Sequence, residues 1–263
     1  MKRKLGINLD CVKNLDARTA LRCVHGAGFD GFFTGPFLTD PKTIEQIANQ
    51  ANALGLRYEF IHAPYHGVNT MWENDADAQA FIQAFFQAVD NAKRNGVDTV
   101  ILHSSSTWCP PLITEEGFQR FDKLIEYAEK NGVKVAIENL RVPAYYESLL
   151  ARYENHPLVG FCYDCGHEHW CSPELPHVER YGNRLFCTHI HDNFGKLNNF
   201  LTVSGDLHLL PFDGNFDFEK MMQRLNAVRY GGALTLELKT HDTSRPDKFF
   251  KDAYTRIAKI AQW

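Results

Sequence analysis

Side chains that commonly bind metals or transfer protons recur along this sequence, each close to the end of a short apolar segment. They are His62, His103, Glu138, Asp164, His167, His189, His191, Asp192, Asp206, His208 and Glu237. Glu138 in VAIENL and Glu237 in LTLELK lie inside apolar segments, and a charge that faces a protein interior needs a partner or a metal ion. Carboxylate and imidazole ligands together suit Mn²⁺, Zn²⁺, Co²⁺ or Fe²⁺ better than Ca²⁺. The residue types therefore predict a divalent-metal site.

The apolar segments alternate with amphipathic ones throughout the chain. We expect strands at 4–10, 30–35, 56–65, 98–104, 133–140, 158–167, 184–193 and 233–241. Helices are expected at 15–25, 40–54, 74–96, 114–131, 145–155, 173–183, 217–232 and 247–263. This alternation predicts an α/β fold, a (β/α)8 TIM barrel that forms a single domain over residues 1–263. The alternative is an open doubly wound sheet, but no glycine-rich nucleotide-binding motif supports it.

The C-terminal ends of barrel strands form the active-site face, and these are the ends that carry the polar side chains. Side chains alternate between the two faces of a strand, so an inward Asp164 implies an inward Cys162 and an outward Cys165. That divergence argues against a paired C-x-x-C motif. By the same alternation, His189 and His191 share a face. The pattern predicts that metal-type ligands converge at one rim of the barrel.

Composition limits the classes of partner. The 28 Lys plus Arg and 32 Asp plus Glu give a formal charge of −4, whereas nucleic-acid-binding proteins usually carry a basic excess. No apolar run approaches the roughly 18 residues that span a bilayer. We therefore expect neither a nucleic-acid nor a membrane partner, and homo-oligomerisation stays open. The seven scattered cysteines favour reduced thiols and a cytoplasmic location.

The ordered segments IHAPY, ILHS, AIENL, YDCGH, THIHDN, GDLHLLPFDGNFDF and LELK resemble the xylose-isomerase-like TIM-barrel superfamily. They cover the third to the eighth predicted strand, which is most of the chain. The superfamily contains sugar and sugar-phosphate isomerases and epimerases, and also endonuclease-four-type AP endonucleases. For the isomerase branch the resemblance implies one divalent metal, with Mn²⁺ or Zn²⁺ ahead of Co²⁺, Fe²⁺ or Mg²⁺. Its implied ligands are Glu138, Asp164, His189 and Glu237.

In that branch the resemblance also implies that Glu138 and Glu237 act as acid and base, and that His167 binds a substrate oxygen. We expect a metal-dependent isomerase or epimerase of a sugar or sugar-derived ketone, which abstracts a proton next to a carbonyl through a metal-stabilised enediolate. The endonuclease-four branch would recruit further ligands for additional zinc ions, namely His62, His103, Asp206 and His208. The alternatives are therefore a multi-zinc phosphodiesterase or AP endonuclease, and a catalytically silent sugar-binding barrel.

Further candidates for substrate contacts lie near the same strand ends. Aromatic faces bury the apolar sides of sugar rings, and Trp72, Trp108 and Trp170 follow the third, fourth and sixth strands; simple packing of loops is the alternative. Arg141 and Lys239 follow the two glutamates and could bind a phosphate or carboxylate, or be ordinary surface residues. No phosphate-binding loop is present, so a phosphorylated substrate is not predicted. The remaining candidates are Asn8 and His191.

Overall fold

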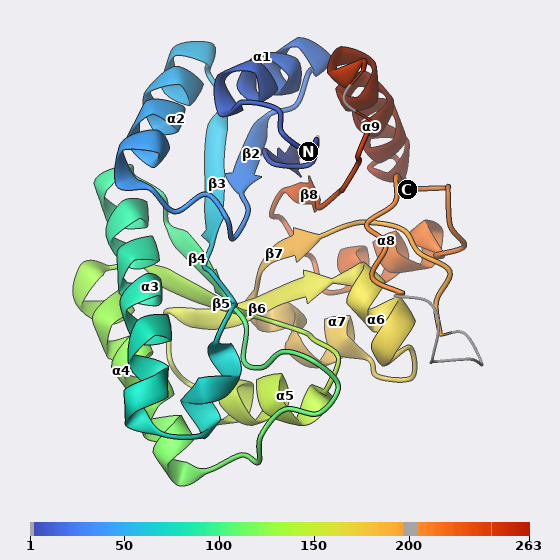
Figure 1. The fold of residues 1–263 in the computed structure, drawn as a ribbon. Coiled ribbons are helices and arrows are strands. Elements are labelled where there is room, and N and C mark those ends of the chain that lie inside the picture. Colours follow the sequence, from blue (N-terminus) through green and yellow to red (C-terminus); the bar gives the residue numbers. More distant parts are fainter. Residues whose placement is uncertain (1–2, 197–204, 243) are drawn as a thin grey trace.

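Eight parallel strands surround the centre of the molecule in a computed structural model that describes residues 3–196, 205–242 and 244–263 (Figure 1). The strands are β1 (Leu5–Asn8), β2 (Gly31–Thr34), β3 (Arg57–His62), β4 (Thr99–Leu102), β5 (Lys134–Glu138), β6 (Val159–Asp164), β7 (Leu185–His189) and β8 (Leu234–Leu236). Their order in the sheet is β7-β6-β5-β4-β3-β2-β1-β8. The predicted single-domain TIM barrel is confirmed.

The barrel closes between β7 and β8 through residues at the very end of each strand. The Ile190 amide donates to the Thr235 carbonyl at 2.8 Å, and the Glu237 amide donates to the Ile190 carbonyl at 3.0 Å. The Thr188 hydroxyl also accepts from the Thr235 amide at 3.2 Å. These bonds make His189 on β7 and Glu237 after β8 neighbours at the rim.

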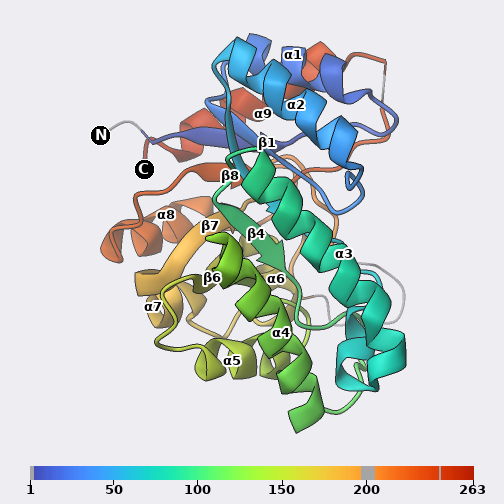
Figure 2. The same cartoon turned by 90° about the vertical axis from the view of Figure 1, so that its left-hand side faces the viewer.

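Helices cover the outside of the barrel, and α3 and α4 lie side by side along one flank (Figure 2). The helices are α1 (Ala17–Ala27), α2 (Pro41–Leu54), α3 (Asp75–Arg94), α4 (Glu115–Asn131), α5 (Pro143–Arg152), α6 (Cys165–Cys171), α7 (His177–Tyr181), α8 (Phe218–Ala227) and α9 (Pro246–Ile260), with 3-10 turns η1 (Val68–Trp72) and η2 (Gly182–Arg184). Side chains at the N-caps explain several starts: Asp16, Asp40, Asn74 and Thr114 each accept from a backbone amide three residues later. No helix in the described part of the chain is long and apolar enough to cross a membrane.

The structure differs from the sequence-based prediction mainly after β6. We predicted a strand with its loop up to residue 167, but α6 begins at Cys165, because the Asp164 carboxylate accepts from the His167 amide at 2.6 Å and caps a helix. The helix predicted at 173–183 covers only His177–Tyr181, because Pro176 confines it to the segment that follows. The chain therefore turns into a helix earlier than its apolar pattern indicates.

Two apolar layers hold the barrel together. The larger layer packs the outer faces of the strands against the helices. The smaller layer fills the barrel interior and consists of Phe33, Phe60, Ile101, Ala136, Cys162 and Cys187. Cys162 belongs to this interior layer whereas Cys165 belongs to the outer one, so the two thiols diverge as the alternation predicts. The interior layer forms a dry floor beneath the C-terminal rim.

Candidate active site

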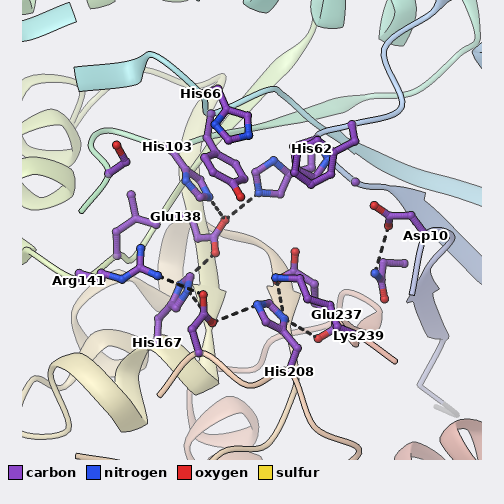
Figure 3. A pocket seen from close by; sticks show the side chains of 18 of the residues that line it. Asp10, His62, His66, His103, Glu138, Arg141, His167, His208, Glu237 and Lys239 are labelled. Carbon is purple, nitrogen blue, oxygen red and sulfur yellow. Dashed lines mark hydrogen bonds and ion pairs between the residues drawn. The ribbon is translucent and has the colours of Figure 1, made fainter. Parts of the chain in front are cut away.

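A cavity of about 840 Å³ opens at the C-terminal ends of the strands (Figure 3). It contains most of the residues that the sequence analysis selected. Those that line it are Asn8, His62, His103, Trp108, Glu138, Arg141, His167, Trp170, Asp206, His208, Glu237 and Lys239. Asp164, His189 and His191 lie below its surface and are fully buried. The barrel thus gathers side chains from β1 and from every strand between β3 and β8 at one rim.

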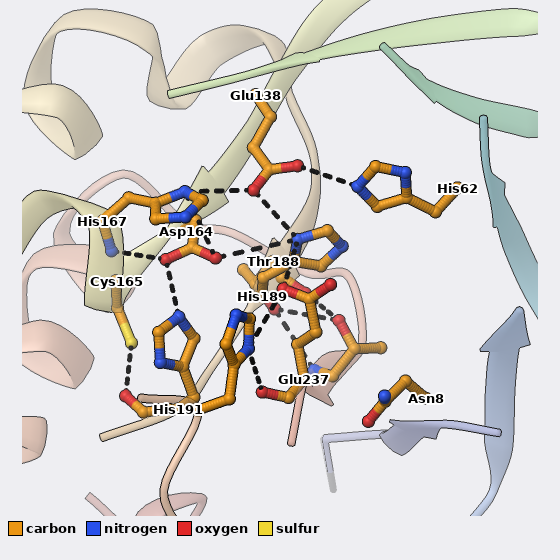
Figure 4. Close-up of polar contacts among 12 residues, drawn as sticks. Asn8, His62, Glu138, Asp164, Cys165, His167, Thr188, His189, His191 and Glu237 are labelled. Carbon is orange, nitrogen blue, oxygen red and sulfur yellow. Dashed lines mark hydrogen bonds and ion pairs between the residues drawn. The ribbon is translucent and has the colours of Figure 1, made fainter. Parts of the chain in front are cut away.

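The centre of the site is formed by Glu138, Asp164, His189 and Glu237 (Figure 4). One potential ligand atom from each of these residues lies within 4.8 Å of all the others. The His189 Nδ1 atom is 3.4 Å from a Glu138 oxygen, 3.8 Å from an Asp164 oxygen and 3.3 Å from a Glu237 oxygen. Residues at the ends of four successive strands therefore point at one small volume.

Hydrogen bonds around this central group leave specific ligand atoms free. Asp164 Oδ1 accepts from the His167 amide at 2.6 Å and from His191 Nε2 at 3.1 Å, whereas Asp164 Oδ2 is buried without a hydrogen bond. Both ring nitrogens of His189 are also buried without a hydrogen bond. Buried polar atoms that lack partners are costly, and a divalent cation beside Asp164 Oδ2 and His189 Nδ1 would satisfy both of these atoms. The residues present fit a metal ion.

A second group shares Glu138 with the centre and adds His62 and His103. His103 Nε2 is 3.0 Å and His62 Nε2 is 3.4 Å from Glu138 Oε2. His62 Nδ1 donates to the Ala63 carbonyl at 2.8 Å, which fixes the ring with Nε2 toward the carboxylate. Backbone bonds of this kind orient metal-binding histidines in general. The two carboxylate oxygens of Glu138 thus face different sets of nitrogens.

A third group converges on Asp206. The Nε2 atoms of His167 and His208 lie 3.4 Å and 3.0 Å from Asp206 Oδ1, which is buried. Both rings donate Nδ1–H to backbone carbonyls, of Asn139 at 2.9 Å and of Glu237 at 2.9 Å. The structure therefore brings together the further ligand types, His62, His103, Asp206 and His208, with the central group.

The pKa shifts express how strongly these groups depend on one another. Burial alone would raise the pKa of Asp164, but His167 and His191 lower it to about 2. Burial would lower the pKa of His189, but Glu237 and Glu138 raise it to about 10. Burial would also raise the pKa of Glu138, and His189 and His103 hold it well below its usual range. His189 and the carboxylates of Glu138 and Glu237 thus favour each other's charged forms at the place where a cation would fit.

Several predicted contact residues lie elsewhere than expected. His191 is fully buried, bonds Asp164 and stacks on His208 with 4.2 Å between ring centroids, so it touches ligands rather than the cavity. Its ring leaves no room at position 166, where a Cβ would lie 2.0 Å from it, so Gly166 is required there. His191 therefore lies beneath the cavity, where with His208 and Glu237 it forms a further group of possible ligand atoms within 4.8 Å of one another.

Asn8 lines the cavity, but its amide group is engaged by the Leu238 backbone, with Nδ2 to the carbonyl at 3.1 Å and the amide to Oδ1 at 2.8 Å. Trp72 is not at the cavity: it packs in the core and donates to the Ser104 carbonyl, so the packing alternative was right for this residue. Trp108 and Trp170 do line it, in an edge-to-face pair with centroids 5.2 Å apart.

Arg141 lies over the Trp170 ring at 5.1 Å and pairs with Asp206 at 3.3 Å. Several other lining residues were not selected from the sequence, among them Asp10 and Tyr65. Asp10 is a largely buried carboxyl whose pKa burial raises, and it accepts from Asn8 Nδ2 at 3.1 Å. Tyr65 stacks on His103 with centroids 4.9 Å apart. The sequence did carry a signal for both residues, because Asp10 shares a face with Asn8 and Tyr65 closes the IHAPY segment.

Fold and site together define a TIM-barrel protein with a carboxylate–histidine centre at its C-terminal rim. The chain belongs to the xylose isomerase-like TIM barrel family, whose model matches residues 21–259. The resemblance seen in the strand-end motifs is therefore confirmed.

Known relatives support the fold. An uncharacterized protein of Sinorhizobium fredii, y4fM, is 32% identical over 183 residues, which are 64% of this chain and 56% of the relative, so the match spans only about half of that protein. A solved D-tagatose 3-epimerase-like protein has a TM-score of 0.73 at 20% identity, covering 97% of this chain and 98% of the other. The 3-keto-D-glucoside 4-epimerase of E. coli has a TM-score of 0.76 at 16% identity and covers 100% of both chains.

Proposed function

We propose that this protein is a divalent-metal-dependent isomerase or epimerase of a sugar or sugar-derived ketone. The observation that carries the proposal is the placement of Glu138 and Glu237. They come from β5 and from the end of β8, approach His189 Nδ1 to within 3.4 Å and both line the cavity. Sugar epimerases are among the solved proteins that share the fold, which supports this reading.

The chemistry requires removal of a proton from carbon next to a carbonyl, and its return. Glu138, Asp164, His189 and Glu237 would hold the cation, which when bound polarises the substrate oxygens. One glutamate would take the proton and the other would return it, and carboxylates on different strands can address opposite faces of one carbon. His167, whose Nε2 points toward Asp206 at the cavity wall, would donate to a substrate hydroxyl.

Separate Glu138→Gln and Glu237→Gln variants test these roles. With Mn²⁺ added, each should lose about a hundredfold or more of solvent deuterium exchange into a panel of ketoses and inososes, followed by NMR, because general acid–base catalysis contributes ~10²–10⁴-fold. Metal content is measured on the same samples, to separate lost proton transfer from lost metal. Glu126→Gln, on the exposed surface of α4, makes the same charge change and should keep full exchange. A glutamine variant with full exchange would remove that glutamate from the mechanism.

A specific observation favours a second candidate, a multi-zinc phosphodiesterase. The ligand types extend beyond the central group to the His62–His103 pair and to Asp206 with His167 and His208, which is more than one metal ion needs. Several metal ions together suit in-line displacement at phosphorus.

Metal stoichiometry separates the two candidates. We expect one tightly held ion per chain by mass spectrometry of the purified protein, because the central group alone supplies a complete ligand set. Three zinc ions per chain, together with cleavage of DNA that contains an abasic site, would instead establish the phosphodiesterase. If the purified protein exchanges deuterium into a ketose and does not cleave this DNA, the isomerase is supported.

A further inference from the structure

Two lysines and a histidine form one side of the cavity mouth. Lys13 follows β1, and Lys239 and His241 follow β8; all three line the cavity. We call these three residues the basic wall. Figure 3 places Lys239 beside Glu237 and His208, and so next to the central group.

Backbone pairing holds the basic wall together. Val12 and Thr240 form a parallel bridge, in which the Lys13 amide donates to the Thr240 carbonyl at 3.1 Å and the Thr240 amide donates to the Cys11 carbonyl at 2.8 Å. Val12 is buried in the outer apolar layer, whereas Lys13, in the turn that follows, is exposed and lines the cavity.

Side chains alternate between the two faces of the chain after β8. Leu238 is buried in the outer apolar layer, and Lys239 faces the cavity. Paired parallel segments lie about 4.8 Å apart, so the bridge between Val12 and Thr240 places Lys13, Lys239 and His241 on neighbouring segments of the chain.

The two lysines of the basic wall, Lys13 and Lys239, have no ion-pair partner among the described residues. By contrast, Arg141 across the cavity is paired with Asp206. The carboxylates at the cavity floor face imidazoles, and Asp10, which lies three residues before Lys13, accepts a hydrogen bond from Asn8. A chain with a net charge of −4 therefore presents unpaired positive charge at the mouth of its main cavity.

We propose that the basic wall binds an anionic group of the substrate, a phosphate or a carboxylate carried at the end of the molecule remote from the reacting carbon. Lysine ammonium groups bind such anions by charge-assisted hydrogen bonds. The inference rests on the proposed function, because the reacting carbon is the one from which the proposed isomerase removes a proton. The substrate is accordingly an acidic or phosphorylated keto sugar rather than a neutral one.

The test compares ligands with one carbon skeleton. D-Fructose, D-fructose 6-phosphate and D-fructuronate carry a neutral, a phosphate and a carboxylate group at the same carbon, and inorganic phosphate needs no sugar recognition. Their Kd values are measured by calorimetry on the Mn²⁺-loaded protein and on a Lys13→Gln/Lys239→Gln variant. At least one anion should bind about tenfold tighter than D-fructose, and the variant should lose about tenfold to a hundredfold for it, as expected for one or two charge-assisted hydrogen bonds.

The control variant, Lys130→Gln/Lys251→Gln, removes the same charge from exposed positions on α4 and α9 and should bind as the wild type does. If the wall variant loses affinity for D-fructose 6-phosphate, the anion is a phosphate; if it loses affinity for D-fructuronate, the anion is a carboxylate. Equal binding of all probes, absence of binding, or unchanged affinity in the wall variant overturns the proposal. Deuterium exchange is scored separately, so a protein that binds anions through the wall but exchanges no ketose would refute the isomerase and leave the anion site standing.

Discussion

At the scale of single residues, hydrogen bonds decide which atom of each side chain faces the site. His62, His167 and His208 each donate Nδ1–H to a backbone carbonyl, so each presents Nε2 to a carboxylate. Asp164 likewise uses one oxygen on an amide and an imidazole and keeps the other free. Side chains preoriented in this way would lose little conformational freedom on binding a cation.

The raised pKa of His189 makes a prediction about pH. Glu237 and Glu138 raise this pKa from 6.5 to about 10 against the effect of burial, so the charged imidazole stabilises the metal-free fold fully below pH 6.5. That contribution declines as the pH rises toward 10. A bound metal ion displaces the proton, so the difference in Tm between the metal-loaded and metal-free protein should widen between about pH 6.5 and about pH 8.5.

Calorimetry of both forms across this range measures the difference. The control is a His156→Asn variant. His156 lies outside the cavity, with Nε2 3.7 Å from Glu129, so the difference in Tm should widen in this variant as it does in the wild type. A difference that stays constant with pH would mean that His189 does not exchange its proton for the metal.

What the sequence predicts at this scale is residue type and strand position, not partners. Glu138 and Glu237 are recognisable because carboxylates interrupt apolar strands. The roles of Asn8 and His191 depend on the Leu238 backbone and on Asp164, which are distant along the chain. Alternation places both on the expected faces, but only the folded arrangement reveals what each touches.

At the scale of elements, α6 is held by a buried ionic network. Glu168 on α6 lies 2.5 Å from Arg224 on α8 and 3.0 Å from His177 on α7. His177 in turn bonds the hydroxyl of Tyr146 on α5 at 2.8 Å. Because α6 also carries His167, this network anchors one wall of the site to three outer helices.

We predict strong coupling between Glu168 and Arg224. Glu168→Gln leaves Arg224 paired with Glu179 alone, and Arg224→Met leaves Glu168 with His177 alone, so each should lower the free energy of unfolding by about 2 kcal/mol. The double variant should lose clearly less than the sum, measured by urea denaturation. Lys248→Met breaks an exposed pair with Asp252 and should cost below about 1 kcal/mol. Additive losses in the double variant would contradict the coupling.

This helix is also the element that the sequence pattern does not predict. The segment after Asp164 continues an apolar run, so periodicity favours a longer strand. The helix begins here because the Asp164 side chain accepts from the His167 amide and caps it. Asp164 is at the same time a member of the central group of the site. Long helices such as α3 and α4, with clear caps and apolar faces, match the prediction closely.

At the scale of the whole molecule, the regular alternation of strand and helix is sufficient to predict the barrel. The convergence of polar residues at one rim then follows from the parallel strand directions. The basic wall does not follow, because it depends on the pairing of residues 12 and 240 beyond the ends of their strands. Sequence spacing alone gives no indication of that contact.

Barrel closure also has a consequence for the order of folding. The bonds between Asn8 and Leu238 join residues 230 positions apart, whereas Ile101 and Ala136 on β4 and β5 pair across 35. Closing the longer loop costs about 2 kcal/mol more in chain entropy, so β8 should dock late. Glu138, Asp164 and His189 come from three consecutive strands and can assemble before that step. Glu237 joins this group last, so the candidate metal site is complete only once the final strand has docked.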